Sequence, residues 1–308
     1  MRVLVTGGCG FVGANVVAKL LARGHDVVAY DPLVAGNSLD LVLDHAERGR
    51  VAIVCGDVTD LPLLLRTSQE HGIEAIVHLA FSMGIVGENV SKAVAVNCQG
   101  AANVFETAAL LGLRKVVWSG SNAVFGPPAR YPTLPLPDDA PHFPDTIYGA
   151  SKSFVERLAA HYARERDVVC NGARLVIMYG PGRLRGGAMH VVDAFDAARH
   201  DEAYEVPFPD ELQGFLYVAD AADCLVLLVE AGQTGTPVYN VAGETCTVWE
   251  YAQCAARVAG GGRLTRGGGT FPAQLTWDIS TVALERDVGF RHEHTLESGL
   301  AAWLAASR

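Results

Sequence analysis

The sequence predicts an α/β fold, with a doubly wound parallel sheet and a smaller C-terminal lobe. In the first half of the chain, short β-branched runs alternate with longer segments of helical spacing, which is the pattern of repeated β-α units. The β-branched runs are apolar throughout. Such runs are expected when helices cover both faces of a parallel sheet.

The elements of the first half can be placed in order. Strands are expected at 2–6, 26–30, 51–55, 75–79 and 115–119. Helices are expected between them, at 11–23, 39–48, 61–71 and 91–111. Consecutive parallel strands require such crossover segments, because the chain must return to the starting edge of the sheet.

The second half is less regular. Segment 127–144 holds seven of the fourteen prolines, so it can form neither a helix nor a central strand. Glycine triplets bracket segment 260–269, whose composition predicts a flexible linker. A further strand is expected at 237–241, and helices at 218–230, 248–258 and 296–305. We expect residues 1–174, completed by about 215–242, to form the sheet domain, and 175–214 and 243–308 to form the smaller lobe.

Composition excludes several classes of protein. A chain of 308 residues, 50% hydrophobic and 19% charged, can bury a large core. Its apolar stretches fall short of the roughly 20 residues that a membrane span requires, and no leader precedes Val3. The seven cysteines form no Cys-x-x-Cys pair, which favours reduced thiols and a cytoplasmic protein. A net charge of −10 without a basic block argues against nucleic acid as a partner.

A glycine-rich turn follows the first strand directly. Gly7, Gly10 and Gly13 lie between an apolar strand and an amphipathic helix, so the chain can approach a pyrophosphate at the helix N-terminus. Asp31 follows Gly7 by 24 positions, at the end of the next strand, where a carboxylate can bind an adenosine ribose diol. This combination predicts a Rossmann dinucleotide site. The alternative is an ordinary turn and an ordinary helix-leading acid.

The acidic residues favour NAD over NADP. The Asp31 carboxylate would repel a ribose phosphate, and no arginine stands beside it in the sequence. A second acid, Asp57, ends the third strand on the same side of the sheet and could meet the adenine ring. Equally, Asp57 to Asp60 could cap the helix that begins at Leu61.

Tyr148 and Lys152 open a strongly helical segment, with Thr146 or Asp145 as the expected cap. The four-residue spacing places the phenol and the ammonium on one helix face. A free tyrosine has a pKa of about 10, and an adjacent ammonium, a helix N-terminus and an oxidised nicotinamide would each favour the phenolate. Tyr148 could then accept the hydroxyl proton of a carbinol as its hydride leaves. The alternative is a chance pair on a solvated helix.

Segment 116–121 ends the fifth strand at the carboxyl edge of the sheet, where ligands bind in open α/β folds. With these residues the chain resembles an extended short-chain dehydrogenase/reductase of the NAD-dependent epimerase/dehydratase group. The matching motifs run through nearly the whole length: Val5-Thr6-Gly7, Gly56-Asp57-Val58, His78-Leu79-Ala80, Val96-Asn97, 119–126, 148–152, 174–182, 215–220 and Tyr239-Asn240-Val241.

The resemblance implies a role for each site residue. Ser121, with Ser119 as the competing serine, matches the family's catalytic hydroxyl residue, Tyr148 its acid/base, and Lys152 the residue that binds the nicotinamide ribose. The expected NAD-binding residues are Gly7, Gly10, Phe11, Val12, Gly13, Asp31, Asp57, Val58, Leu79, Ala80, Phe81, Asn97, Tyr148 and Lys152. The expected substrate-binding residues are Ser121, Asn122, Tyr148, Ile177 and Arg185. A homodimer through helices 91–111 and 148–166 is also implied, although core packing explains their small residues equally well.

Departures from the family pattern bear on the reaction. Dehydratases of this group carry an acidic pair after the catalytic hydroxyl residue, where this chain has Asn122 and Ala123, so dehydration lacks its acid and base. Nucleotide-sugar epimerases usually have an asparagine at the position of Ile177 and an arginine where this chain has Gln213 and Gly214. Both losses weaken the prediction of a diphosphate-sugar substrate.

Two further features leave alternatives open. Arg183 and Arg185 could anchor a phosphate or carboxylate, or they could be two solvated loop arginines. Gln213 could face the substrate. The run His292-Glu293-His294 lies in a polar turn with no nearby partner, so no metal site is expected.

The leading hypothesis is NAD-dependent oxidation of a secondary hydroxyl on a sugar or sugar-nucleotide-like substrate, as an epimerase or a dehydrogenase. One alternative is an NAD(P)-dependent reductase or dehydrogenase of a small, non-nucleotide hydroxy compound. Another is a cofactor-sensing protein without chemistry, which would be expected to lose Tyr148 or Lys152; both are present.

Overall fold

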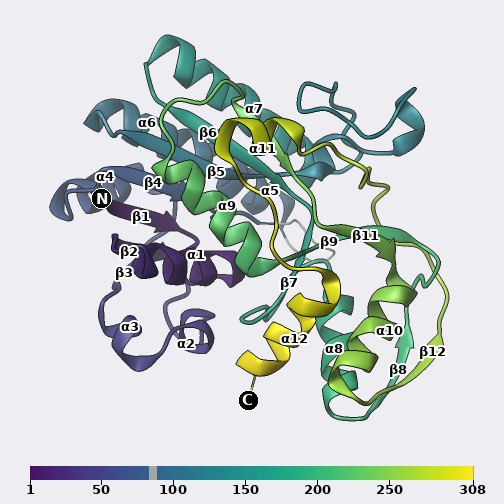
Figure 1. Ribbon diagram of the computed structural model, residues 1–308. Helices are drawn as coiled ribbons and strands as arrows, with labels where there is room; N and C mark the ends of the chain where they lie inside the picture. Colours follow the sequence, from purple (N-terminus) through teal and green to yellow (C-terminus); the bar gives the residue numbers. More distant parts are fainter. Residues whose placement is uncertain (83–88, 308) are drawn as a thin grey trace.

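A seven-stranded parallel sheet forms the centre of the computed structural model, which describes residues 1–82 and 89–307 (Figure 1). Its strand order is β10-β6-β5-β4-β1-β2-β3. The strands are β1 (Arg2–Thr6), β2 (Asp26–Asp31), β3 (Ala52–Cys55), β4 (Ala75–His78), β5 (Lys115–Ser121), β6 (Cys170–Leu175) and β10 (Val238–Val241). The predicted doubly wound fold is confirmed.

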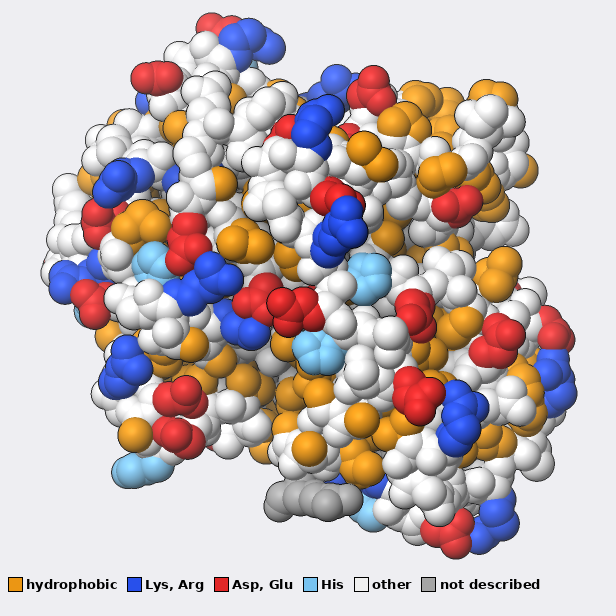
Figure 2. Space-filling view, in the orientation of Figure 1, with side chains coloured by type: hydrophobic (Ala, Val, Ile, Leu, Met, Phe, Trp, Pro, Cys, Tyr) orange, Lys and Arg blue, Asp and Glu red, His pale blue; other side chains and the backbone are white. Residues whose placement is uncertain are grey.

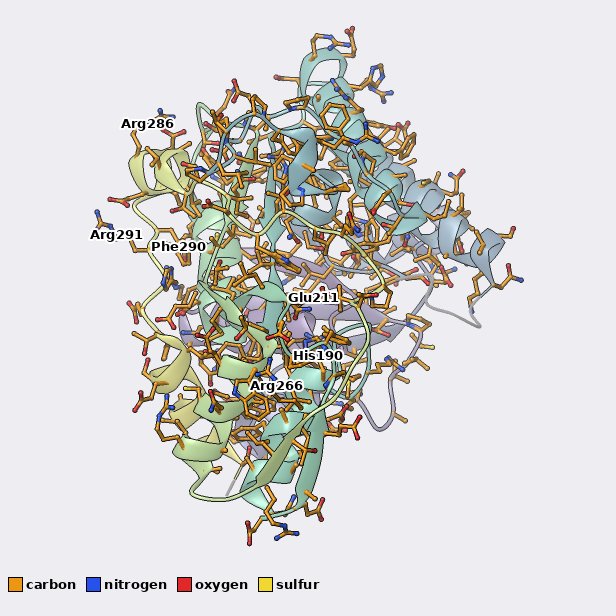
Figure 3. The ribbon with its side chains drawn as sticks, turned by 90° about the vertical axis from the view of Figure 1, so that its right-hand side faces the viewer. His190, Glu211, Arg266, Arg286, Phe290 and Arg291 are labelled. Carbon is orange, nitrogen blue, oxygen red and sulfur yellow. The ribbon has the colours of Figure 1, made fainter. Side chains whose placement is uncertain are left out.

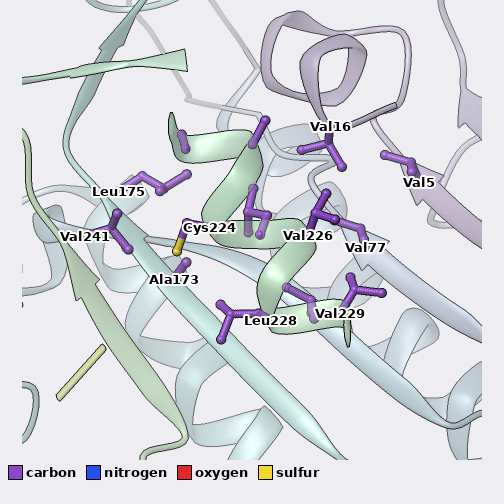
Figure 4. Packing of buried hydrophobic residues seen from close by; sticks show 14 of the residues in the cluster. Val5, Val16, Val77, Ala173, Leu175, Cys224, Val226, Leu228, Val229 and Val241 are labelled. Carbon is purple, nitrogen blue, oxygen red and sulfur yellow. The ribbon is translucent and has the colours of Figure 1, made fainter. Parts of the chain in front are cut away.

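Helices cover both faces of this sheet, which explains the continuous apolar runs. On one face α1 and α9 pack against Val3 and Val5 of β1, whereas Leu4, between them, contacts the opposite layer. Figure 4 shows α9 lying over the sheet, with apolar side chains of the helix and the strands in one cluster. The helices of the two layers include α1 (Phe11–Ala22), α9 (Val218–Glu230), α4 (Leu61–Glu70), α6 (Ala101–Leu111), α7 (Ile147–Glu165) and α11 (Val282–Val288).

The smaller lobe lies beside the carboxyl edge of the sheet, at the lower right of Figure 1. A three-stranded sheet, β11-β9-β7, and the two-stranded pair β12-β8 pack on three helices around a separate apolar cluster. These elements are β7 (Ile177–Tyr179), α8 (His190–Arg199), β8 (Ala203–Val206), β9 (Leu212–Tyr217), β11 (Glu244–Thr247), α10 (Val248–Ala259), β12 (Arg263–Arg266) and α12 (Leu296–Ala306).

Segment 260–269 is not the flexible linker that its glycines predict. Its central residues form β12, which pairs in parallel with β8, from Arg263 opposite Ala203 to Arg266 opposite Val206. Gly260 and Gly262 adopt positive φ angles of 77° and 95° before the strand, so these glycines shape a turn. Composition does not reveal this strand pairing, which overrides the flexibility expected from the glycines.

Two predicted helices are interrupted. The helix expected at 39–48 is two short helices, α2 (Leu39–Val42) and α3 (His45–Gly49), because Asp44 and Glu47 form a capping box that starts a new helix. The helix expected at 91–111 contains a π-helical segment, Ala95–Gly100, between α5 (Val90–Val94) and α6. π-Bulges of this kind occur frequently at functional sites.

The proline-rich stretch behaves as predicted. Its elements are a single 3₁₀ turn, Pro128–Arg130, and an isolated bridge between Leu136 and Ile279; another 3₁₀ turn, Asn122–Val124, precedes it. All seven cysteines are unpaired. Within residues 1–82 and 89–307, no helix has the length and apolarity to cross a bilayer. Figure 2 shows acidic and basic side chains interspersed over one face, without a basic block.

Candidate active site

The glycine turn after β1 is packed so closely that side chains would not fit. Gly7 has a φ of 70°, and a Cβ there would lie 2.8 Å from the Ala80 backbone nitrogen. A Cβ at Gly13 would lie 2.1 Å from the Gly7 carbonyl oxygen. The turn thus brings the backbone of β1, the end of β4 and the start of α1 together.

The start of α1 suits an anion. Gly10 is the N-cap and provides no side-chain hydrogen bond, so the first-turn N–H groups of Phe11 and Val12 have no partner within the helix. These groups and the positive end of the helix dipole face the region beyond the carboxyl edge of the sheet. The residues therefore fit the pyrophosphate of a dinucleotide.

Asp31 closes β2 beside this turn. Its carboxylate is buried and accepts hydrogen bonds from the backbone N–H groups of Cys9, at 3.2 Å, and Leu33, at 2.9 Å. Burial raises the pKa of Asp31, while the two hydrogen bonds and the charge of Arg185 oppose the rise. Although no arginine neighbours Asp31 in the sequence, the fold brings the charge of Arg185 within electrostatic reach.

Of the two acids after β3, Asp60 is the helix cap. Its carboxylate accepts from the Leu63 N–H at 2.9 Å, at the start of α4. Asp57 instead accepts from the backbone and hydroxyl of Thr59 through Oδ1, and its carbonyl oxygen accepts from the Tyr30 hydroxyl. Asp57 therefore does not cap α4, which was the alternative to its predicted role beside the adenine.

The end of β4 is held by the π-helical segment. The Asn97 side chain accepts from the Ser82 N–H and donates to the Ser82 carbonyl oxygen, both at 2.8 Å. This two-bond clamp fixes the backbone next to Leu79, Ala80 and Phe81. Asn97 thus braces the backbone that follows β4. Val58 is buried, and its carbonyl oxygen accepts from Asn103 on the adjoining helix.

The structure brings the predicted reactive residues together. The Thr146 hydroxyl accepts from the Gly149 N–H at 3.0 Å and caps α7, so Thr146, not Asp145, is the cap. Ser121, at the end of β5, lies near enough to Tyr148 to act on the pKa of its phenol. The ammonium of Lys152 lies 5.6 Å from the centre of the Tyr148 ring.

Lys152 is fully buried beneath Tyr148. Its Nζ donates to the Ser119 carbonyl oxygen at 2.5 Å and to the Ser119 hydroxyl at 3.3 Å. The ring of Phe81 lies across the ammonium, with 3.2 Å between Nζ and the ring centre, a cation–π contact in a desolvated site. Ser119, the serine that competed with Ser121, therefore holds Lys152.

The expectation of an acidic phenol is not met by the protein's own groups. Burial raises the pKa of Tyr148 to about 12, and Ser121 only partly opposes the rise. Burial also lowers the pKa of Lys152, which Glu156 partly opposes. The sequence placed the ammonium correctly but could not show how far burial disfavours both charged forms.

A buried ion pair fixes the reaction helix to the sheet. Glu156, one turn after Lys152, accepts two hydrogen bonds from the Arg174 guanidinium of β6, at 2.7 and 2.8 Å. Arg174 also donates to the Asn240 side chain at 3.1 Å and to the Asp138 carbonyl at 2.7 Å. This network holds α7 against β6, the strand that pairs with β5.

The predicted substrate residues lie on the side of the smaller lobe. Asn122 is buried and donates to the Thr276 carbonyl at 3.0 Å, which ties β5 to the lobe. Ile177 opens β7, opposite Phe215 of β9. Gln213, also on β9, is completely buried and pairs through Oε1 with Nε2 of His190, 2.8 Å away. No motif in the sequence points to His190, which is the first residue of an amphipathic helix.

The two arginines of the loop after β7 differ in exposure and surroundings. Arg185 is exposed and acts electrostatically on Asp31, whereas Arg183 is partly buried, with its guanidinium 5.4 Å from the Phe11 ring. Elsewhere in the lobe, His294 pairs with Asp220 at 2.9 Å. Among the described residues, no group of three or more His, Cys, Asp or Glu side chains is arranged to hold a metal ion.

Comparisons with known proteins agree with this geometry. The family model "NAD dependent epimerase/dehydratase family" matches residues 3–242. A UDP-glucose 4-epimerase from Mycolicibacterium smegmatis is 32% identical over 235 residues, which cover 73% of this chain and 72% of the relative.

Two solved structures are similar over nearly their whole length. A Thermus thermophilus UDP-glucose 4-epimerase in complex with NAD has a TM-score of 0.85 and 24% identity, covering 99% of this chain and 98% of that one. A partial-consensus L-threonine 3-dehydrogenase has a TM-score of 0.87 and 25% identity, with the same coverage. The chain therefore belongs to the NAD-dependent epimerase/dehydratase family and is an NAD-dependent oxidoreductase of the extended short-chain dehydrogenase/reductase type.

Proposed function

We propose that this enzyme oxidises a secondary hydroxyl of a sugar or sugar-nucleotide-like substrate, with Tyr148 as the proton acceptor. The observation that carries the proposal is the buried ammonium of Lys152, held by Ser119 at the end of β5 and 5.6 Å from the centre of the Tyr148 ring. Ser121 orients the reacting hydroxyl, and Tyr148 takes its proton as the phenolate, which the positive charge of the oxidised nicotinamide favours when the coenzyme is bound. Bound NAD supplies the hydride acceptor.

The dinucleotide residues fit NAD. The closed glycine turn and the open first turn of α1 accept the pyrophosphate, and Asp31 binds the adenosine ribose diol. Asp57 lies towards the adenine, while Lys152 binds the nicotinamide ribose. Arg185 lies at the Asp31 end, so we place it with the adenosine half of the coenzyme and no longer with the substrate.

Epimerisation is the reaction that the relatives favour, because the aligned curated protein is named UDP-glucose 4-epimerase. Asn122 and Ala123 supply neither an acid nor a base for dehydration. In an epimerase, the hydride returns to the opposite face of the same substrate and the coenzyme is regenerated. A dehydrogenase instead releases its ketone or lactone and leaves NADH.

One experiment separates these outcomes. The enzyme is mixed with NAD and a panel of nucleotide sugars, free sugars, aldonates and small hydroxy acids, and NADH absorbance and product stereochemistry are followed together. An epimerase forms the inverted sugar without stoichiometric NADH, whereas a dehydrogenase forms one NADH per product. Absence of both from every substrate would contradict the proposed function.

A specific observation favours the small hydroxy compound as a second candidate substrate. Ile177 and Gln213 occupy positions where nucleotide-sugar epimerases of this family usually have an asparagine and an arginine, and Gln213 is a neutral amide whose Oε1 pairs with His190. At these two positions the substrate site therefore lacks the asparagine and the cation of those epimerases.

We also propose a homodimer through the face formed by α5, the π-helical segment, α6 and α7. Apolar side chains are exposed there, with Val94 at 42%, Phe154 at 45% and Ile147 at 56%, which is typical of a protein interface. Phe154→Glu should shift the mass measured by light scattering from dimer to monomer. Val282→Glu, at an exposed valine on α11, should leave the mass unchanged.

A further inference from the structure

Arg183 is held against the dinucleotide half by the loop that carries it. The Asn15 side chain of α1 donates to the Pro181 carbonyl at 3.1 Å, and the Ser38 hydroxyl donates to the Gly182 carbonyl at 2.7 Å. These bonds place Arg183 beside Phe11, the first residue of α1. The guanidinium therefore lies next to the predicted pyrophosphate site, at the border of the two lobes.

The hydrogen-bonding capacity of Arg183 is largely unused. Its Nη1 donates to the Met178 carbonyl oxygen, but its Nε is buried without a partner. None of the ion pairs among residues 1–82 and 89–307 includes Arg183. Withdrawing a cation from water without pairing it with a carboxylate is costly, and Arg183 is partly buried, so the fold maintains a charge that its own residues do not neutralise.

A second unused donor lies close by. Gln213 is completely buried; its Oε1 accepts from Nε2 of His190, and its Nε2 has no partner. Phe208 and Phe271 pack edge-on to the His190 ring at 5.2 and 6.0 Å. Figure 3 shows His190 near Glu211, whose carboxylate accepts from the Phe271 N–H.

The His190 pair is neutral. Burial lowers the pKa of His190 to about 4; the hydrogen bond with Gln213 opposes this shift, and the charge of Arg183 adds to it. Arg183 is thus close enough to act on His190. At neutral pH, the positive charge of this group of residues comes from Arg183.

A line of contacts joins these residues to the reaction centre. Asn122, next to Ser121, donates to the carbonyl of Thr276. The neighbouring Trp277 packs over Gly214, where an added Cβ would lie 3.4 Å from the indole, and Gly214 follows Gln213 in β9. The strand that carries Gln213 is therefore packed, through Thr276 and Trp277, against the residue that follows Ser121.

We infer that Arg183 binds an oxyanion of the substrate, a carboxylate or a phosphate, and that the amide of Gln213 donates to an acceptor on the same substrate. The inference rests on the proposed function in that the ligand is the substrate oxidised at Tyr148. Two unpaired donors, one of them charged, match an acceptor-rich anion. Neither donor can be satisfied by an alkyl group.

The test is ligand binding to the NAD-loaded enzyme, followed by thermal shift and calorimetry. The probes are glucose, glucuronate, glucose 1-phosphate and UDP-glucose, which separate a neutral sugar from a carboxylate, a phosphate and a diphosphate. At least one of the three anions should raise the melting temperature more than glucose does. Arg183→Met should weaken binding of that anion at least tenfold and change glucose binding less than twofold.

Further variants keep the test informative if Arg183→Met folds poorly. Gln213→Glu retains an acceptor for His190 but adds a negative charge. This variant should therefore weaken binding of the same anion at least tenfold and binding of glucose less than twofold. Arg257→Met, at an arginine exposed on α10, is the matched control and should bind as the wild type does.

Three results would overturn the inference: no preference for any of the three anions, equal losses for glucose and the anion, or a loss with Arg185→Met in place of Arg183→Met. Because the readout is binding, failure of the proposed chemistry is seen separately. If wild-type enzyme shows no hydride transfer yet binds an anion through Arg183, the proposed function fails and this inference stands.

Discussion

Two arginines in this molecule, Arg174, which is buried, and Arg183, which is partly buried, are held in opposite ways. Arg174, below the reaction helix, uses its guanidinium fully, with two bonds to Glu156 and others to Asn240 and Asp138. Arg183, at the border of the lobes, has a carbonyl oxygen as partner and leaves Nε unpaired. The first is satisfied by the fold itself, whereas the second is satisfied by a ligand. The same residue type thus serves structure in one region and recognition in the other.

The largest expected effect on stability is at the buried ion pair between Arg174 and Glu156. Glu156→Ala leaves Arg174 as an uncompensated buried charge, so the free energy of unfolding should fall by about 3–5 kcal/mol in denaturant titration. Glu165→Ala, in an exposed pair with Arg164 on the same helix, is the matched control and should change it by less than about 0.5 kcal/mol. Similar losses in the two variants would show that the buried network does not fix α7.

The neutral histidine of the smaller lobe predicts a pH dependence. The folded pKa of His190 is about 4, below the unfolded value of about 6.5, so the unfolded chain binds the proton more readily. Its contribution to stability is complete above pH ~6.5 and is lost as the pH falls towards 4. Between pH 7 and 5, His190 should account for a loss of about 1–2 kcal/mol.

Comparison of two variants isolates this contribution. His190→Gln should lose less stability than the wild type between those pH values, as measured by urea unfolding. His200→Gln, at an exposed histidine that ends the same helix, should keep the wild-type slope. An unchanged slope in His190→Gln would mean that His190 is protonated as readily in the folded protein as in the unfolded chain.

The smallest effect on stability is expected at Arg183. Arg183→Met removes a cation that the fold does not neutralise, so the lost packing and the relieved burial of charge should nearly cancel, within about 1 kcal/mol. Thermal unfolding without ligand measures this. A loss as large as that of Glu156→Ala would show that Arg183 is a structural arginine, and the contrast between the two regions would disappear.

The two regions also differ in how well the sequence predicts them. Around Gly7, Asp31 and Tyr148, function depends on short spacings within single β-α units, so the sequence alone predicted these elements and their common edge. The Arg183 site depends on residues from the loop after β7, from α8 and from β9, and no local spacing joins them. His190 could not be identified without the β9 contact.

The misreadings have the same origin. Composition indicated a linker where pairing with β8 makes β12 a strand. The four-residue spacing indicated an acidified tyrosine, whereas burial raises the pKa of Tyr148, and burial is a property of the whole fold. Local rules therefore predicted which groups meet but not how solvent exclusion changes them.

The most direct test of the central claim is single-turnover hydride transfer by Tyr148→Phe, followed as NADH formation with a substrate identified from the panel. The variant should bind NAD and substrate as the wild type does, because the ring and its packing remain, while the rate falls by about 10²–10⁴-fold. A rate within a factor of two of the wild type, at unchanged NAD affinity, would show that the Tyr148 hydroxyl is not the proton acceptor.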